Sequence, residues 1–371
     1  MINVGIVGLG FMAATHIKAY RQLPGARVAA ICNPSGRHLD GDFSNVAGNV
    51  GGGDPVKLDL AGVQTTKAFS DLLQNPAIQL IDICAPTKAH HELSLAALQA
   101  GKHVLCEKPL ARSARLAREI ADAAAAARTF FMPAMCMRFW PGWDWLQTAI
   151  RDETYGKTLA ARFRRVAEPP AWGQKNFFVG AESGGALFDL HVHDTDFVQF
   201  CFGRPRSVFS TGYVKFSGAV DHVVTQYEVA SGATVQAEGG WAMAPGFGFS
   251  MSYTVNFQNA TADYDLARGK DALRLIEKGE ARIIPCDGPD GYVVELRHLL
   301  EAIQSGKPPT IVTARDGQSA VEICEAEEES VRTRQPVSLY DGFDFHPALA
   351  SFGLKPGTGP IQIKLNETGP V

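Results

Sequence analysis

The chain has 371 residues, more than one compact domain usually holds, which favours two domains. Its net charge of -4 and its 46% of hydrophobic residues indicate an ordinary globular core and argue against a nucleic-acid partner. The seven cysteines lack the spacing of a metal site, and no uncharged apolar run is long enough to span a membrane. We therefore expect a cytoplasmic protein with reduced thiols, no metal and no membrane contact.

The N-terminal residues show a strand, a glycine turn, a helix and a second strand in close succession. Residues 2–7 are apolar and predict a buried strand, which Gly8 and Gly10 interrupt. A helical pattern then runs from residue 11 to about 23, and residues 27–32 predict another strand. This order is typical of the βαβ unit of a doubly wound parallel sheet.

The alternation of strands and helices continues to about residue 135. Residues 36–63 are rich in Gly, Asp and Asn and predict a loop. Residues 1–128 are thus expected to form a dinucleotide-binding Rossmann domain. Its remaining predicted elements are a helix at 69–73, a strand at 80–85, a helix at 90–101, a strand at 103–106, a helix at 113–128 and a strand at 130–135.

From about residue 158 the pattern changes to longer strands with alternating polarity. Residues 129–340 therefore predict an α+β domain with a large, mostly antiparallel open sheet covered by helices on one face. Thr313 and Asp316 resemble a capping box at the start of its last helix. Residues 341–371 predict an irregular tail. The clearest elements are strands at 223–229, 234–238 and 250–258 and helices at 185–202, 292–305 and 314–334.

The first chemical signal is the motif Gly8-x-Gly10-x-x-Ala13 between a predicted strand and a predicted helix. Gly8 permits a tight turn, Gly10 lets the backbone approach a pyrophosphate, and a small residue at 13 keeps the helix close to the strand. The N-terminus of the helix adds free N–H groups and the positive end of a dipole. The motif in this context predicts a dinucleotide site.

Asn33 occupies the position at which an acidic residue normally holds the adenosine ribose. An acid would repel a 2′-phosphate, whereas Asn33 does not, and Ser35 and Arg37 could bind one. The alternative is that Asn33 bonds a ribose hydroxyl of NAD while Arg37 is solvated. We expect NADP to be favoured slightly over NAD.

Two further motifs carry ionisable side chains. Lys108 directly follows a predicted strand, where ligands bind in parallel sheets, although it could also be an ordinary surface lysine. Asp189 and His193 lie four residues apart in an otherwise apolar helix, with Asp196 nearby. Such a polar face meets either a ligand or a structural partner, an Asp–His bond being the simplest structural explanation.

The sequence resembles the superfamily of glucose-fructose oxidoreductase, inositol dehydrogenase and the rhizopine catabolism proteins. The resemblance extends over residues 1 to about 338, and its most specific parts are Glu107-Lys108-Pro109 and the Asp189–His193 pair. The matching stretches are residues 5–16, 82–92, 100–109, 138–141 and 184–193.

The resemblance implies a role for each matching residue. Lys108 corresponds to the catalytic lysine of the family, and Asp189 and His193 correspond to its catalytic acid–base pair. Arg138 and Trp172 fall at positions that often line the substrate pocket in the family. The resemblance implies that Lys108, Asp189 and His193 line the same pocket. Further expected cofactor contacts are Phe11, Met12, Pro86, Thr87, His90, Glu107 and Lys108.

The resemblance also implies the activity, which is reversible hydride transfer between NAD or NADP and a secondary alcohol or ketone of a sugar, inositol or related polyol. It further implies a homodimer or homotetramer joined through the open sheet. His191 stands where many members have Gly, which implies a narrower pocket.

Two alternative functions remain open. One is a reductase of a non-sugar carbonyl or imine, which an apolar pocket would favour over a polyol enzyme. The other is a non-catalytic dinucleotide sensor, against which the presence of Lys108, Asp189 and His193 argues.

Overall fold

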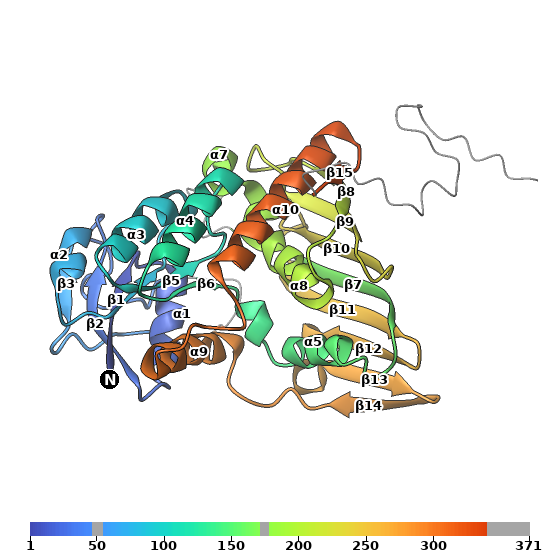
Figure 1. Cartoon of the computed structure of the whole chain (residues 1–371), viewed down its shortest axis with the longest axis horizontal. Helices are drawn as coiled ribbons and strands as arrows, with labels where there is room; N and C mark the ends of the chain where they lie inside the picture. The colour runs from blue at the N-terminus through green and yellow to red at the C-terminus, as the bar shows by residue number, and fades with distance from the viewer. Residues whose placement is uncertain (47–54, 171–177, 340–371) are drawn as a thin grey trace, which may run out of the picture. The chain divides into compact units, whose positions relative to one another are not determined.

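The computed structural model describes residues 1–46, 55–170 and 178–339. A six-stranded parallel sheet forms its first part (Figure 1). The strand order β3-β2-β1-β4-β5-β6 is that of a doubly wound dinucleotide-binding fold, so the predicted parallel sheet is confirmed. The strands are β1 (Ile2–Val7), β2 (Ala26–Cys32), β3 (Gln64–Thr66), β4 (Leu80–Ile83), β5 (His103–Glu107) and β6 (Phe131–Ala134).

Helices connect these strands on both faces of the sheet. The chain moves from β1 to β2 in one direction and from β4 to β5 in the other, so right-handed crossovers place the connecting helices α1 and α3 on opposite faces. The helices of this part are α1 (Phe11–Tyr20), α2 (Phe69–Gln74), α3 (Thr87–Gln99) and α4 (Ala114–Ala126).

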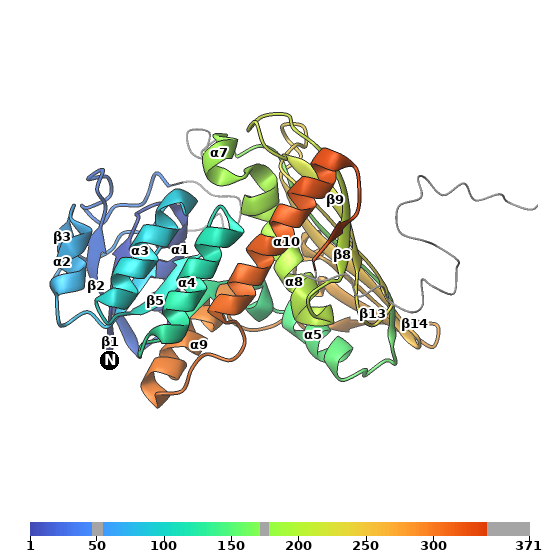
Figure 2. The same ribbon diagram turned by 45° about the horizontal axis from the view of Figure 1, so that its top comes forward.

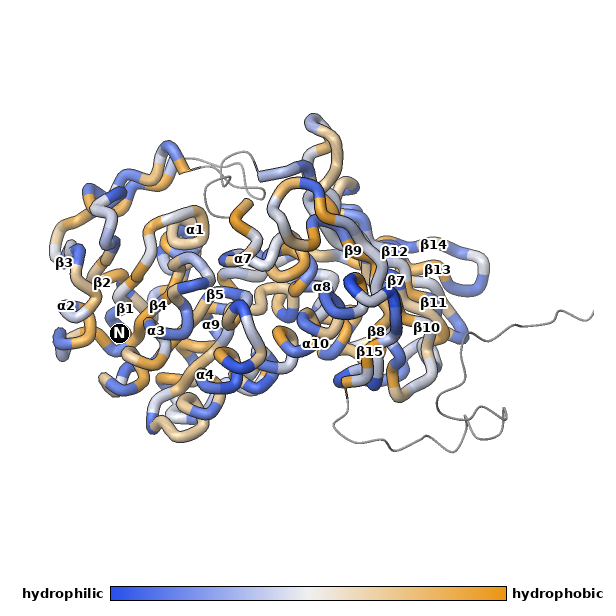
Figure 3. The backbone as a smooth tube through the Cα atoms, turned by 90° about the horizontal axis from the view of Figure 1, so that it is seen from above, coloured by the Kyte–Doolittle hydropathy of each residue, from blue (hydrophilic) through white to orange (hydrophobic). Residues whose placement is uncertain are grey.

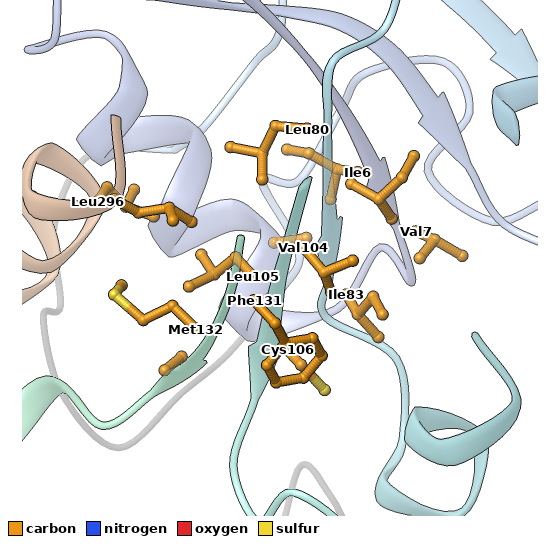
Figure 4. Close-up of a cluster of buried hydrophobic side chains, with 14 of the residues drawn as sticks. Ile6, Val7, Leu80, Ile83, Val104, Leu105, Cys106, Phe131, Met132 and Leu296 are labelled. Atoms are coloured by element: carbon orange, nitrogen blue, oxygen red, sulfur yellow. The ribbon is translucent and has the colours of Figure 1, made fainter. Parts of the chain in front are cut away.

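The interior of the first sheet is apolar because both of its faces are covered. Val4, Ile6, Val104 and Leu105 have no exposed surface, which explains why β1 and β5 are continuous apolar runs rather than alternating ones. Figure 4 shows part of this core, where Leu296 of α9 (Gly291–Ser305) joins strand residues such as Leu105 and Met132.

A nine-stranded sheet forms the second part, in the order β14-β13-β12-β11-β7-β10-β9-β8-β15. The pair β7–β10 is parallel and the other pairs are antiparallel, so the expected mostly antiparallel sheet is confirmed. The strands are β7 (Thr158–Ala167), β8 (Ser207–Tyr213), β9 (His222–Glu228), β10 (Thr234–Gly240), β11 (Phe249–Phe257), β12 (Ala260–Asp265), β13 (Leu273–Glu277), β14 (Glu280–Ile284) and β15 (Val337–Ser338).

Helices α5 (Trp143–Arg151), α8 (Val192–Phe202) and α10 (Ala314–Thr333) cover one face of this sheet (Figures 1 and 2). The capping box of Thr313 and Asp316 is present at the start of α10. Because α10 packs on both β8 and α4, it links the two sheets (Figure 2). Hydrophilic and hydrophobic segments alternate along the tube of Figure 3, as expected for helices with one buried face. No helix of the described ranges is long and apolar enough to cross a membrane.

The helix predicted over residues 185–202 is present, but it is not a regular α-helix throughout. Gly184 and Gly185 at its start have φ values of +81° and +68°, which regular α-helix does not allow. A π-helical turn, Leu187–His191, follows them, and regular α-helix continues from Val192 to Phe202. Such turns occur often at functional sites, and this one contains Asp189.

Candidate active site

A cavity of about 610 Å³ lies at the carboxyl ends of β1, β2 and β4, where parallel sheets bind ligands. It reaches from the turn at Asn33 to Lys108 and Asp189. The cofactor-contact residues expected from the sequence line it, with the exception of Ala13, and they are Gly8, Gly10, Phe11, Met12, Asn33, Ser35, Arg37, Pro86, Thr87, His90, Glu107 and Lys108.

The glycine turn fits a diphosphate. Gly8 has a φ of +86°, and a Cβ there would lie 2.5 Å from the backbone of Ala85, so only glycine is accommodated. Gly10 has nothing within 4 Å of the position of a Cβ, so its open side faces the cavity at the start of α1. Ala13 is fully buried and packs helix α1 on the sheet instead of facing the cavity.

The turn after β2 is held by its own side chains. The amide of Asn33 donates to the carbonyl of Arg37 at 2.8 Å and accepts from the Ser35 hydroxyl at 3.0 Å. Asn33 thus shapes the turn, while the exposed side chain of Arg37 lies at the cavity wall. The turn after β2 therefore presents the guanidinium of Arg37, and it has Asn33 in place of a carboxylate at the position that usually contacts the ribose.

His90 connects the two strand ends that flank the cavity. Its Nδ1 lies 2.8 Å from the carbonyl of Pro109, and its Nε2 lies 2.8 Å from that of Ala85. The ring is buried, and burial lowers its pKa. The neutral ring carries one N–H, so it donates to one of these carbonyls and contacts the other, between the segment that carries Lys108 and the end of β4.

A buried ionic network that sequence reasoning missed lies behind Glu107. His16 of α1 has its Nδ1 2.9 Å from Asp82 and its Nε2 3.2 Å from Glu107. Although burial alone would lower the pKa of His16, Asp82 and Cys84 hold that pKa well above its ordinary value. The resulting imidazolium bonds to Asp82 through Nδ1 and lies in ion-pair contact with Glu107 through Nε2, behind the wall of the cavity. The only sequence signal was the position of His16 inside a family-like stretch.

A second cavity, of about 140 Å³, adjoins the first and shares Phe11, Met12, Glu107, Lys108 and Asp189 with it. The three residues expected to be catalytic, Lys108, Asp189 and His193, all line this smaller cavity. Residues from the end of β5 and from the segment around the π turn are therefore brought together at one point.

Lys108 and Asp189 make a close contact across the two halves of the chain. The Lys108 ammonium donates to the Asp189 carbonyl at 2.6 Å and to its carboxylate at 3.1 Å. Both side chains are mostly buried, with exposed fractions of 14% and 22%. One residue of the π turn thus supplies two acceptors, which fixes the position of the ammonium group.

His193 contributes a neutral imidazole to the smaller cavity. Burial, followed by the positive charges of Lys108 and Arg165, lowers its pKa well below the ordinary value. Its Nδ1 is buried and has no hydrogen-bond partner within the described ranges. Because Asp189 bonds to Lys108, the simple structural Asp–His pair considered above does not account for these two residues.

Two other residues singled out from the sequence lie away from the cavities. Arg138 is buried and its guanidinium forms a two-point ion pair with Asp196, at 2.8 and 2.7 Å, away from the walls of both cavities. His191 packs against Gly239 and Tyr227, so it does not narrow the pocket as expected. Trp172 lies outside the described residues.

The walls of the smaller cavity are mainly apolar. Aromatic rings and methionine side chains predominate, and an arginine that sequence reasoning missed, Arg165, lies among them. The alternation of inward and outward side chains along β7 could have predicted its position. Arg165 lies two residues after Phe163, which is fully buried, so both side chains point to the inner face of the sheet. The apolar and aromatic lining residues include Phe11, Met12, Met137, Trp140, Phe249, Met251 and Tyr292.

Known proteins resemble the chain along most of its length. Myo-inositol 2-dehydrogenase of Thermotoga maritima is 24% identical over 352 residues, covering 91% of this chain and 98% of that protein. Trans-1,2-dihydrobenzene-1,2-diol dehydrogenase of Xenopus laevis is 31% identical over 163 residues, covering 43% of this chain and 48% of that protein.

A solved structure, levoglucosan dehydrogenase in complex with NADH, has the same fold. It matches with a TM-score of 0.78 at 21% identity and covers 91% of this chain and 99% of that one.

Two family models match successive parts of the chain. The model described as an oxidoreductase family with an NAD-binding Rossmann fold matches residues 2–134, and the model of the GFO/IDH/MocA C-terminal domain matches residues 143–263. Together they span most of the two sheets and both segments that carry the candidate catalytic residues. The chain belongs to the glucose-fructose oxidoreductase, inositol dehydrogenase and rhizopine catabolism family of NAD-binding oxidoreductases that act on CH–OH groups.

Proposed function

We propose that the protein catalyses reversible hydride transfer between a nicotinamide dinucleotide and a secondary alcohol or ketone, using Lys108, Asp189 and His193. The observation that carries this proposal is that all three residues line one cavity, which shares a wall with the larger cavity at the glycine turn. The nicotinamide supplies the hydride acceptor or donor when the cofactor is bound.

The protein's own residues move the proton and stabilise the charge on the reacting oxygen. His193 is neutral because its pKa is lowered, so it can accept the hydroxyl proton during oxidation and return it during reduction. The Lys108 ammonium stabilises the developing alkoxide. Asp189 holds that ammonium in place through its carboxylate and carbonyl, instead of orienting His193.

Two substrate classes compete. Relatives named for inositol and levoglucosan favour a sugar, inositol or related polyol. The mainly apolar walls of the smaller cavity favour the second candidate, a less hydroxylated carbonyl or alcohol, and a relative named for a dihydrobenzenediol supports that class. A dinucleotide sensor would need neither a neutral histidine nor a fixed ammonium in the same cavity.

The finer cofactor choice is also proposed. Arg37 and Ser35 at the wall of the larger cavity, with Asn33 in place of an acid, support a slight preference for NADP over NAD. Assembly into a homodimer or homotetramer, location in the cytoplasm and division into domains at residue 128 remain predictions.

Replacing Gly10 by Val tests the cofactor site. The φ of Gly10 is -105°, which valine tolerates, and its open side faces the cavity, so the chain should fold while dinucleotide affinity falls at least about tenfold. Calorimetric titration with NADH and NADPH measures the change. Thr15→Val, one turn further along α1 and outside both cavities, is the control. Unchanged affinity in Gly10→Val would show that the dinucleotide binds elsewhere.

Replacing Arg37 by Ala tests the NADP preference. The variant should lower kcat/KM for NADP about tenfold and leave that for NAD almost unchanged, because only NADP carries the 2′-phosphate. Arg27→Ala is the matched control, since Arg27 lies at the start of β2 outside both cavities. A wild-type enzyme with the higher kcat/KM for NAD contradicts the preference.

The variants His193→Ala and Lys108→Ala test the catalytic cluster. We expect His193→Ala to lower kcat by about 10²- to 10⁴-fold with little change in cofactor affinity. The double variant should lose less than the product of the two single losses, because both groups act on one oxygen. Lys270→Ala, which removes an exposed lysine outside the cavities, is the control. Fully multiplicative losses would mean that the two side chains act independently.

The lowered pKa of His193 predicts the pH dependence of oxidation. A base is active when deprotonated, so kcat/KM should stay level as the pH falls from 8 through about 6.5, the ordinary histidine pKa, and should decline only at lower pH. A pH–rate profile with saturating cofactor measures this. A decline centred at pH 6.5 or above contradicts a neutral, buried His193.

A further inference from the structure

Arg165 is the buried arginine of the smaller cavity, and the pleat of β7 explains its position. Along this strand Phe163 and Arg165 point to the covered face, whereas Arg162 and Arg164 point to the other face, where both pair with Glu238. Only 3% of Arg165 is exposed, and its guanidinium lies 5.3 Å from the ring of Trp143. A charged group in such a place needs partners for all of its donors.

Among the residues that the structure describes, the partners of Arg165 leave one of its nitrogens without an oxygen acceptor. Nε and Nη2 donate to the two carboxylate oxygens of Asp194 at 2.9 and 3.3 Å. The hydrogen-bond partner of Nη1 among the described residues is the sulfur of Met251, at 2.8 Å, and a thioether is a weak acceptor. Because both Arg165 and Met251 line the cavity, a ligand oxygen there would complete the set of acceptors.

Within residues 1–46, 55–170 and 178–339, the remaining walls offer few polar groups to a substrate. Lys108 and His193 act at the reacting oxygen, Asp189 holds the Lys108 ammonium, and Glu107 pairs with His16 and accepts from the backbone N–H of Lys108. Among the other described lining residues, Trp140 and Tyr292 contribute one polar atom each on otherwise apolar rings. A fully hydroxylated sugar would press several oxygens against apolar side chains, at a cost for each unpaired group.

We propose that Arg165 determines substrate specificity by binding a second oxygen of the substrate next to the reacting alcohol, and that the substrate is apolar beyond these two oxygens. The second oxygen is neutral, a hydroxyl or a ketone, because Asp194 already balances the charge of Arg165. This inference rests on the proposed function and selects the less hydroxylated of its two substrate classes.

The reaction follows from the proposed function. The alcohol carbon loses a hydride to the oxidised nicotinamide, and its hydroxyl proton passes to His193, which gives a ketone and the reduced nicotinamide. The second oxygen keeps its bonds and accepts a hydrogen bond from Nη1 of Arg165 throughout. In the reverse direction the ketone regains the hydride and the proton.

Three alcohols with the same six-carbon ring test the substrate class. Cyclohexanol has one hydroxyl, trans-cyclohexane-1,2-diol has two and myo-inositol has six. At pH 8, where His193 is neutral, we expect kcat/KM for the diol to exceed both others by at least about tenfold. Reduction of NAD and NADP is followed by absorbance. In a fourth compound, trans-2-hydroxycyclohexanecarboxylate, a carboxylate replaces the second hydroxyl. We expect its kcat/KM to be lower than that of trans-cyclohexane-1,2-diol.

Variants of Arg165 test its role separately from the fold. Arg165→Lys keeps the charge, and the double variant Arg165→Met with Asp194→Asn removes both members of the ion pair. In each we expect the ratio of kcat/KM for the diol to that for cyclohexanol to fall about tenfold, whereas a merely structural loss would lower both values equally. Arg162→Met changes an arginine on the outer face of the same strand and should keep the ratio.

Each of the remaining outcomes contradicts either the inference about Arg165 or the proposed function. If myo-inositol is the best substrate, or if the ratio does not change in the Arg165 variants, the inference fails and the proposed function stands. If trans-2-hydroxycyclohexanecarboxylate is preferred over the diol, Arg165 binds an anionic group of the substrate, and the proposal of a neutral second oxygen is wrong. If the wild-type protein binds a dinucleotide but oxidises none of the four alcohols, the inference fails, and the proposed function fails only if sugars and simple ketones are not turned over either.

Discussion

The contact between Lys108 and Asp189 is the interaction on which the site depends. Lys108 extends from the carboxyl end of β5 in the parallel sheet, and Asp189 lies in the π turn that precedes α8 of the second part. The carbonyl and the carboxylate of one residue hold the ammonium group, so two segments that are 81 positions apart in the sequence meet at a fixed point. The two cavities adjoin at this point because both include these side chains.

The surrounding structure keeps Lys108 in that place. His90 lies 2.8 Å from the carbonyl of Pro109, and His16 forms an ion pair with Glu107 at 3.2 Å, so buried imidazoles contact the residues on both sides of Lys108. The buried charges of His16 and Lys108 each have a carboxylate partner, as a low-dielectric interior requires. The glycine turn and α1, which carries His16, therefore contribute to the smaller cavity as well as to the larger one.

The sequence predicted those features that depend on local pattern. Three such features can be identified from a few consecutive residues, because the local sequence sets the local conformation. They are the glycine motif, the lysine after β5 and the spacing of Asp189 and His193. Which of the two arginines, Arg138 or Arg165, lines the smaller cavity could not be predicted in the same way. The answer depends on the carboxylate with which each arginine pairs in the folded chain. Arg138, paired with Asp196, lies outside the cavity, whereas Arg165, paired with Asp194, lines it.

A crystal structure with NADP and cyclohexane-1,2-diol tests the central claim most directly, namely that the two parts of the chain build one hydride-transfer site. The account predicts that the nicotinamide enters the smaller cavity, with its C4 about 3–3.5 Å from the alcohol carbon. The reacting oxygen should then lie within hydrogen-bond reach of both Lys108 and His193. A nicotinamide bound outside this cavity, or a reacting carbon beyond the reach of both side chains, would contradict it.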